Sequence, residues 1–132
     1  MPSHFEFDFE HKILLLVLEG EVGNAEILAS NSKTAEQVNR LQPSGIIADV
    51  SGVTKVDVST EVIRSTARRP GPHTPEAALF IVAPQEHLFG MARMYEMVGS
   101  RTRPNLKIVR TREEALSRLG VSSAKFERVG PS

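Results

Sequence analysis

Residues Gly45 to Thr60, with the sequence GIIADVSGVTKVDVST, decide how the rest of the chain is interpreted. A short apolar run at 46–48 ends at Asp49, and a polar loop then leads to Asp57 and Ser59 at the expected start of a helix. A strand that leads through a loop into a helix N-terminus is the arrangement in which an α/β protein presents a hydroxyl group or binds an anion. The stretch therefore predicts a central strand and marks the corner where function is concentrated.

The composition is that of one soluble globular domain. The chain has 132 residues, of which 40% are hydrophobic and 24% are charged. Sixteen basic residues balance sixteen acidic ones, so the overall charge favours neither nucleic acid nor an anionic membrane. The chain has no cysteine, which excludes disulfides, a thiolate nucleophile and a cysteine-ligated metal. The acidic N-terminus does not resemble a signal peptide, and the longest apolar run, at 13–18, is too short to span a membrane. We expect a cytoplasmic protein with no membrane span and no nucleic-acid partner.

The first forty residues predict a hairpin followed by helix. Residues 5–9 alternate between phenylalanine and acidic side chains, which is typical of a strand with one covered face. On this interpretation the exposed face carries Glu6, Asp8 and Glu10. The run at 13–18 is apolar on both faces and pairs with the first strand through a tight turn. Helical spacing then runs from Asn24, a candidate N-cap, to about Leu41, as one helix or two short ones.

After the strand at 45–50, helices and strands alternate to about residue 120. The patterns predict helices at 59–68, 86–98 and 112–119, strands at 77–83 and 106–109, and an irregular proline-rich segment at 69–75. The order β-β-α-β-α-β-α-β-α predicts an α/β domain over 1–120, with a mostly parallel mixed five-stranded sheet and about four helices. Residues 121–132 are predicted to be a loose tail, with Phe126 and Val129 as candidates for docking onto the domain.

Ser59 is the residue with the clearest chemical potential. In the first turn of a helix, its hydroxyl would be surrounded by free backbone N–H groups and by the positive end of the helix dipole. A phosphate added there would be stabilised, and its charge of about −1.5 to −2 would change which partner surface fits. The aspartate two residues earlier, Asp57, can cap the helix, accept a proton or ligate a metal carried by a kinase. The alternative interpretation is ordinary N-capping by Asp57 or Ser59.

The sequence offers little support for catalysis. A serine nucleophile at Ser59 or Ser51 would need a histidine base, and the four histidines lie in a terminal segment, a turn, a loop and a helix start. There is no G-x-S-x-G elbow, no His-x-x-x-His pair and no glycine-rich phosphate loop. We therefore expect a protein that is not an enzyme and has no metal and no cofactor. Met91, Met94 and Met97 are expected to fill the core, and the alternative is that they line an apolar pocket or a partner face.

The element order and the central segment together resemble the STAS family, named for sulfate transporters and anti-sigma-factor antagonists. The family has a strand ending in Asp or Asn, and then roughly Leu-Ser-x-Val-x-Phe-Ile-Asp-Ser-Ser-Gly-Leu. The corresponding stretch here runs from Asp49 to Thr60, DVSGVTKVDVST. The segments GMARMYEM at 90–97 and LKIVRTREEAL at 106–116 also resemble stand-alone bacterial members. The similarity covers about residues 5–120 in element order.

This resemblance implies a non-enzymatic regulatory module of the anti-sigma-antagonist type. It implies a protein partner such as an anti-sigma factor or a serine kinase, and it is compatible with a homodimer. Ser59 falls on the family's phosphoacceptor serine, and Val58 and Thr60-Glu61 replace its neighbours. The residues expected to support Ser59 or contact the partner are Asp49, Ser51, Asp57, Thr60 and Arg64. The alternative is a small-molecule or lipid-binding domain, as in the related Sec14 type, with an apolar pocket lined by Phe89, Met91, Met94 and Tyr95.

Overall fold

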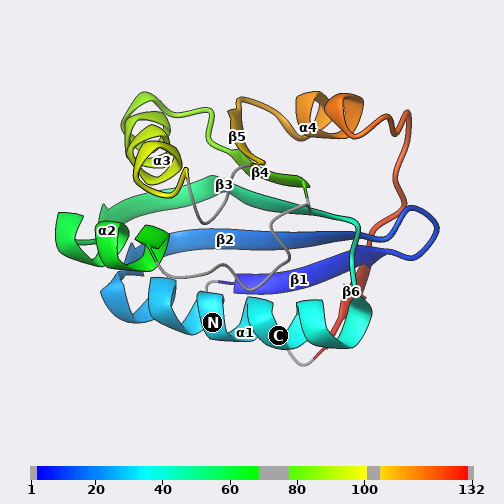
Figure 1. Ribbon diagram of the computed structural model, residues 1–132, viewed down its shortest axis with the longest axis horizontal. Coiled ribbons are helices and arrows are strands. Elements are labelled where there is room, and N and C mark those ends of the chain that lie inside the picture. The colour runs from blue at the N-terminus through cyan, green and yellow to red at the C-terminus, as the bar shows by residue number, and fades with distance from the viewer. Residues whose placement is uncertain (1–2, 69–77, 101–104, 131–132) are drawn as a thin grey trace.

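The computed structural model describes residues 3–68, 78–100 and 105–130 as one six-stranded sheet with four helices (Figure 1). The proline-rich segment predicted at 69–75 lies outside these residues. The elements are β1 (Ser3–Asp8), β2 (Ile13–Gly23), α1 (Asn24–Leu41), β3 (Gly45–Asp57), α2 (Thr60–Arg68), β4 (Ala78–Val82), α3 (Glu86–Val98), β5 (Leu106–Val109), α4 (Arg112–Arg118) and β6 (Glu127–Val129).

The sheet confirms the α/β class and the predicted order of the first nine elements, but it has six strands instead of the predicted five because β6 follows α4. Its strands lie in the order β5-β4-β3-β2-β1-β6, with β3 in the interior. Strands β2, β3, β4 and β5 are parallel neighbours, because each crossover carries a helix. The predicted hairpin is present as the antiparallel β1–β2 pair, with Phe5 opposite Leu16. The residues from Asn24 to Leu41 form a single helix.

The two faces of the sheet are covered unequally. Helices α1, α2 and α3 lie on one face, over a core that includes Phe5, Leu14, Ile46 and Leu88. Helix α4 and the segment after it cover the other face, over Leu15, Ile47, Phe80 and Val109. In Figure 1, α1 runs along the lower edge of the view, α2 and α3 lie toward the left end, and α4 lies at the upper right. The carboxyl end of β3 leads into α2 at that left end.

Strand β3 is longer than the sequence predicts, so the expected polar loop does not exist. Pairing with β2 continues from Asp49 to Asp57, with Gly23 opposite Asp57 at the far end. The register shifts twice along this stretch, and Gly20 takes a φ of 74° at one of the irregularities. Val53 and Val56 pack against the core between exposed polar residues, and pairing with β2 keeps those polar residues in the strand. Only residues 58 and 59 connect β3 to α2.

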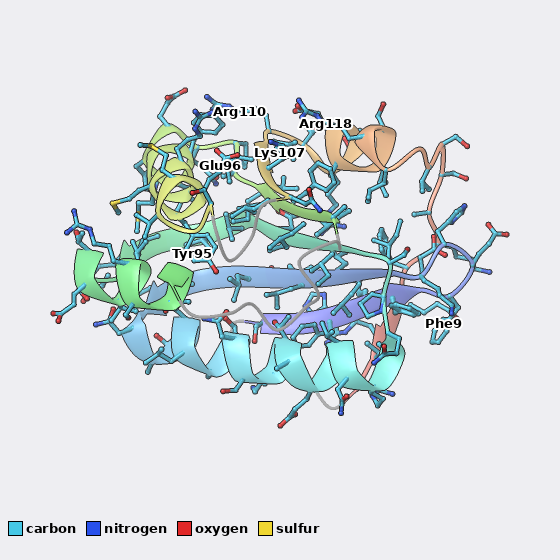
Figure 2. The ribbon with its side chains drawn as sticks, in the orientation of Figure 1. Phe9, Tyr95, Glu96, Lys107, Arg110 and Arg118 are labelled. Carbon is cyan, nitrogen blue, oxygen red and sulfur yellow. The ribbon has the colours of Figure 1, made fainter. Side chains whose placement is uncertain are left out.

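Two other predictions are wrong at the edge of the sheet formed by β1 and β6. Residues 127–129 are not loose, because they form β6 and pair with β1. Asp8 is not on a solvated face, because its side chain is only 2% exposed. Its carboxylate accepts backbone N–H groups of Glu10, His11 and Lys125 at 2.9, 3.0 and 3.2 Å. These hydrogen bonds connect the β1–β2 turn to the segment after α4. Phe9, in the same turn, is exposed at the end of the hairpin (Figure 2).

Candidate functional site

Ser59 is the N-cap of α2. Its Oγ accepts the backbone N–H of Val62 at 3.1 Å, and its carbonyl accepts the N–H of Ile63, also at 3.1 Å. The residue is exposed, so its hydroxyl remains open to solvent while it caps. Ser59 therefore caps α2, as the alternative interpretation predicted, and is also the candidate phosphoacceptor.

Asn24 holds this corner together from outside α2. Its Oδ1 accepts the backbone N–H of Ser59 at 3.0 Å, so the first residue of α1 serves the start of α2. The prediction that Asn24 caps its own helix is wrong. Helix α1 instead begins after Gly23, whose N–H donates to Glu26 Oε1 at 2.7 Å. Asn24 and Ser59 are 35 positions apart in the sequence, so no local sequence pattern indicates this contact.

The surface around Ser59 is acidic. A shallow depression beside it is lined by Glu21, Val22, Gly23, Glu26, Lys55 and Asp57. The first turns of α2 add Thr60, Glu61 and Arg64, all of them exposed. Among the side chains that the structure describes, these positions bring four carboxylates and two basic groups to this end of the sheet. Of the predicted supporting residues, Asp57, Thr60 and Arg64 lie at this corner with Ser59.

Asp49 and Ser51 do not belong to the corner. Eight strand residues separate Asp49 from Asp57, a span of about 26 Å at ~3.3 Å per residue. The Asp49 side chain is 5% exposed and forms an ion pair with Arg112 Nε, from the first turn of α4. The Ser51 N–H donates to Asp49 Oδ1 at 2.9 Å, and the Ser51 carbonyl accepts from Gln85 Nε2 at 2.6 Å. Asp49 thus connects β3 to α4, and Ser51 connects β3 to the residue before α3. Neither residue contacts Ser59 through these interactions.

The environment of Asp49 keeps it charged. Burial raises the pKa of its carboxyl, but hydrogen bonds from Ser51 and the guanidinium of Arg112 outweigh burial and hold the pKa below its ordinary value. The pKa of Asp8 is lowered in the same way, with burial opposed by hydrogen bonds from His11, Lys125 and Glu10. Both carboxylates are acceptors that fix the fold, and neither lies where it could activate Ser59.

The described residues assemble no catalytic constellation around Ser59. His4 and His11 contact acidic side chains of the β1–β2 region, and in the described residues no histidine hydrogen-bonds to Ser59. His73 lies outside the described segments. No group of three histidine or acidic side chains that could hold a metal occurs within residues 3–68, 78–100 and 105–130. No helix in this described part is long and apolar enough to cross a membrane.

An apolar cavity of about 200 Å³ lies between the sheet and α1, α2 and α3. Of the four residues predicted to line a pocket, Met91 and Tyr95 line this one. Met94 is not among its lining residues, and Phe89 instead packs under the guanidinium of Arg110, whose carbon lies 3.8 Å from the ring centre. Met97 is exposed and does not fill the core. Helices α1 and α2 also contribute walls to the cavity, which no local sequence pattern indicates.

The architecture matches that of solved anti-sigma-factor antagonists. The structure of the anti-sigma factor antagonist SpoIIAA in its unphosphorylated form aligns with a TM-score of 0.59 and 16% sequence identity, over 89% of this chain and 96% of that one. The Bacillus cell fate determinant SpoIIAA in the phosphorylated form aligns with a TM-score of 0.53 and 16% identity, over 89% and 98%. No protein-family model and no curated protein matches the sequence. The chain therefore has a fold similar to that of SpoIIAA, in agreement with the fold that the resemblance predicted.

Proposed function

We propose that this chain is a non-enzymatic regulator of the anti-sigma-factor antagonist type, switched by phosphorylation at Ser59. The observation that carries the proposal is the position of Ser59, an exposed hydroxyl at the N-cap of α2 in a SpoIIAA-like fold. The partner is an anti-sigma factor with serine-kinase activity. The proposed contact surface comprises Ser59, Asp57, Thr60 and Arg64, and it excludes Asp49 and Ser51.

The geometry of α2 supports a stable phosphoserine. A helix start leaves backbone N–H groups without helical partners, and these groups and the dipole attract an anion. At Ser59 one such group, the N–H of Val62, already points at the side chain. A phosphoryl group attached to the Ser59 Oγ would add three acceptor oxygens next to this helix start, where free N–H groups are available to donate to them. Glu61 is exposed, and water therefore screens its repulsion.

The acidic character of the corner gives the switch its direction. A partner that covers unmodified Ser59 covers a neutral hydroxyl flanked by Asp57 and Glu61. After phosphorylation the same partner would have to bury a dianion beside those carboxylates, which costs free energy unless new basic groups pair with it. Phosphorylation is therefore expected to weaken the complex.

The test is phosphorylation in vitro by the serine kinases of the anti-sigma type encoded in the same genome, with the modified residue mapped by mass spectrometry. We expect phosphate on Ser59 in the wild type, none on Ser59→Ala, and unchanged modification of Ser65→Ala, which lacks another exposed hydroxyl on the same helix. Phosphate on Thr60 alone, or no phosphate with any of these kinases, would overturn the proposal.

A further inference from the structure

The cavity beneath α1, α2 and α3 has a physical cause in the inner face of α1. The fully buried positions of α1 are Ser30, Thr34 and Gln37, while Ile27, Val38 and Leu41 pack against the core beside them and are only partly buried. Most helices place large apolar residues at such positions. Ser30 and Thr34 are small, and their hydroxyls turn back to their own helix, donating to the Ile27 carbonyl at 3.0 Å and to the Ser30 carbonyl at 2.7 Å. The volume that larger side chains would fill stays open.

The walls of the cavity are overwhelmingly aliphatic. They include Leu16 and Leu18 of β2, Val50 and Val53 of β3, and Ile81 of β4. Tyr95 enters from α3, and Figure 2 shows it extending from that helix toward the middle of the sheet. An apolar cavity of about 150 Å³ in a protein core can stay dry and take up benzene. The cavity here is partly open to the surface, and its volume of about 200 Å³ has room for a single substituted ring.

One polar atom on the wall lacks a partner. The side-chain oxygen of Thr66, on the inner face of α2, is buried and makes no hydrogen bond. A helical threonine ordinarily donates to the carbonyl three or four residues earlier. The carbonyl four residues earlier, that of Val62, instead receives the hydroxyl of Ser65 at 3.1 Å. Thr66 as a whole is 4% exposed, so water does not compensate it from the surface.

We propose that this cavity binds a small, mostly apolar molecule, the size of one substituted aromatic ring, whose single hydroxyl group pairs with Thr66. The apolar walls supply the affinity, and the unpartnered hydroxyl supplies the selectivity, because a buried polar group left unpaired penalises a ligand that cannot pair with it. The site is independent of the proposed phosphorylation. It lies on the inner face of α2, whereas Ser59 is exposed at the start of that helix.

The test compares benzyl alcohol with ethylbenzene, which replaces the hydroxyl by a methyl group. Affinities are measured by following the methyl resonances of the folded protein during titration. The two ligands differ in hydration, so the informative quantity is the ratio of their dissociation constants in each variant. We expect Thr66→Val, a change of nearly equal shape, to reduce the preference for the alcohol by about five- to tenfold relative to wild type, the value of one hydrogen bond.

Two further variants make the outcome decisive. Thr66→Ser keeps a hydroxyl and should keep the preference. Ala92→Leu extends a side chain from α3 into the cavity and should abolish binding of both ligands. The proposal is overturned if neither ligand binds the wild type, if the perturbed methyl groups lie away from the cavity walls, or if Thr66→Val retains the wild-type ratio.

Discussion

Replacing Ser59 by alanine should destabilise the start of α2 even without any kinase or partner. The substitution removes the oxygen that accepts the Val62 N–H at 3.1 Å, but it leaves the backbone N–H that donates to Asn24 at 3.0 Å. Helix α2 has nine residues, fewer than an isolated helix needs in water, so its stability depends on this cap and on packing. Loss of a serine N-cap costs about 1 kcal/mol. For a chain of this size that loss lowers Tm by about 3–5 °C.

Two companion substitutions separate the contributions to this corner. Ser59→Asp keeps an oxygen at the cap and adds a negative charge at the positive end of the helix, so its stability should lie within about 0.5 kcal/mol of wild type. Asn24→Ala removes the acceptor of the Ser59 N–H, at a cost of about 0.5–1 kcal/mol. The two hydrogen bonds serve the same helical turn, so the double variant of Ser59→Ala and Asn24→Ala should be non-additive.

Urea denaturation followed by circular dichroism gives the free energies, and amide hydrogen exchange reports whether the loss is confined to α2. The expected order of stability is wild type and Ser59→Asp together, then Ser59→Ala. The reasoning is refuted if Ser59→Ala is as stable as wild type and the Val62 amide stays equally protected, or if Ser59→Asp loses as much stability as Ser59→Ala. The result also determines how binding data for Ser59→Ala are interpreted, because a frayed helix can weaken a contact by itself.

Other substitutions test the rest of the architecture. Arg112→Met leaves the buried Asp49 carboxylate without its cation and should cost about 2 kcal/mol at pH 7, whereas Arg118→Met, which breaks only a surface pair on α4, should cost about 0.5 kcal/mol or less. Folding lowers the pKa of Asp49, so the stability that this carboxylate contributes is present above its unfolded pKa of about 4 and is lost as the pH falls through the folded pKa. Urea denaturation at a series of pH values should therefore show that the stability deficit of Arg112→Met shrinks in strong acid. A deficit that stays constant with pH would contradict this account. Thr66→Val should stabilise the ligand-free protein by about 1 kcal/mol, because it replaces an unpaired buried hydroxyl by a methyl group; a loss of stability in thermal melts would show that the hydroxyl is paired. Ending the chain at residue 120 removes Val121, Phe126 and β6 and should cost about 3 kcal/mol or more, whereas an unchanged denaturation midpoint would mean that this segment does not pack.

The sequence predicted those elements whose periodicity is strong and local. Helix α3 and strand β5 have the predicted bounds, because an apolar stripe at helical spacing and a short buried run are clear signals. Strand β3 was cut short at residue 50 because Ser51, Thr54 and Lys55 look like loop residues. They belong to a strand because β2 is long enough to pair with them, and pairing partners are not visible in a single segment. Strand β6 has three residues, too few for any periodicity to register.

The candidate site was predicted in part for a related reason. Ser59 could be found because a serine before a helical pattern is a local cap signal. The contacts that define its surroundings join residues far apart in the chain, Asn24 to Ser59 over 35 positions and Asp49 to Arg112 over 63. The cavity is a volume that side chains do not fill, so no single residue indicates it. The sequence feature related to it is the set of polar residues at the buried positions of α1, Ser30, Thr34 and Gln37.

The central claim is that the charge state of Ser59 controls binding of a partner, and calorimetry of two defined forms tests it most directly. Protein with unmodified Ser59 and protein with phosphoserine installed at position 59 are each titrated into the anti-sigma kinase that modifies the chain, and phosphoserine at position 65 serves as the control. We predict that phosphoserine at 59 weakens binding by a factor within about 5–150, the range typical of regulatory coupling, while the control binds like unmodified protein. Equal affinity of the unmodified protein and the position-59 phosphoserine form would contradict the account.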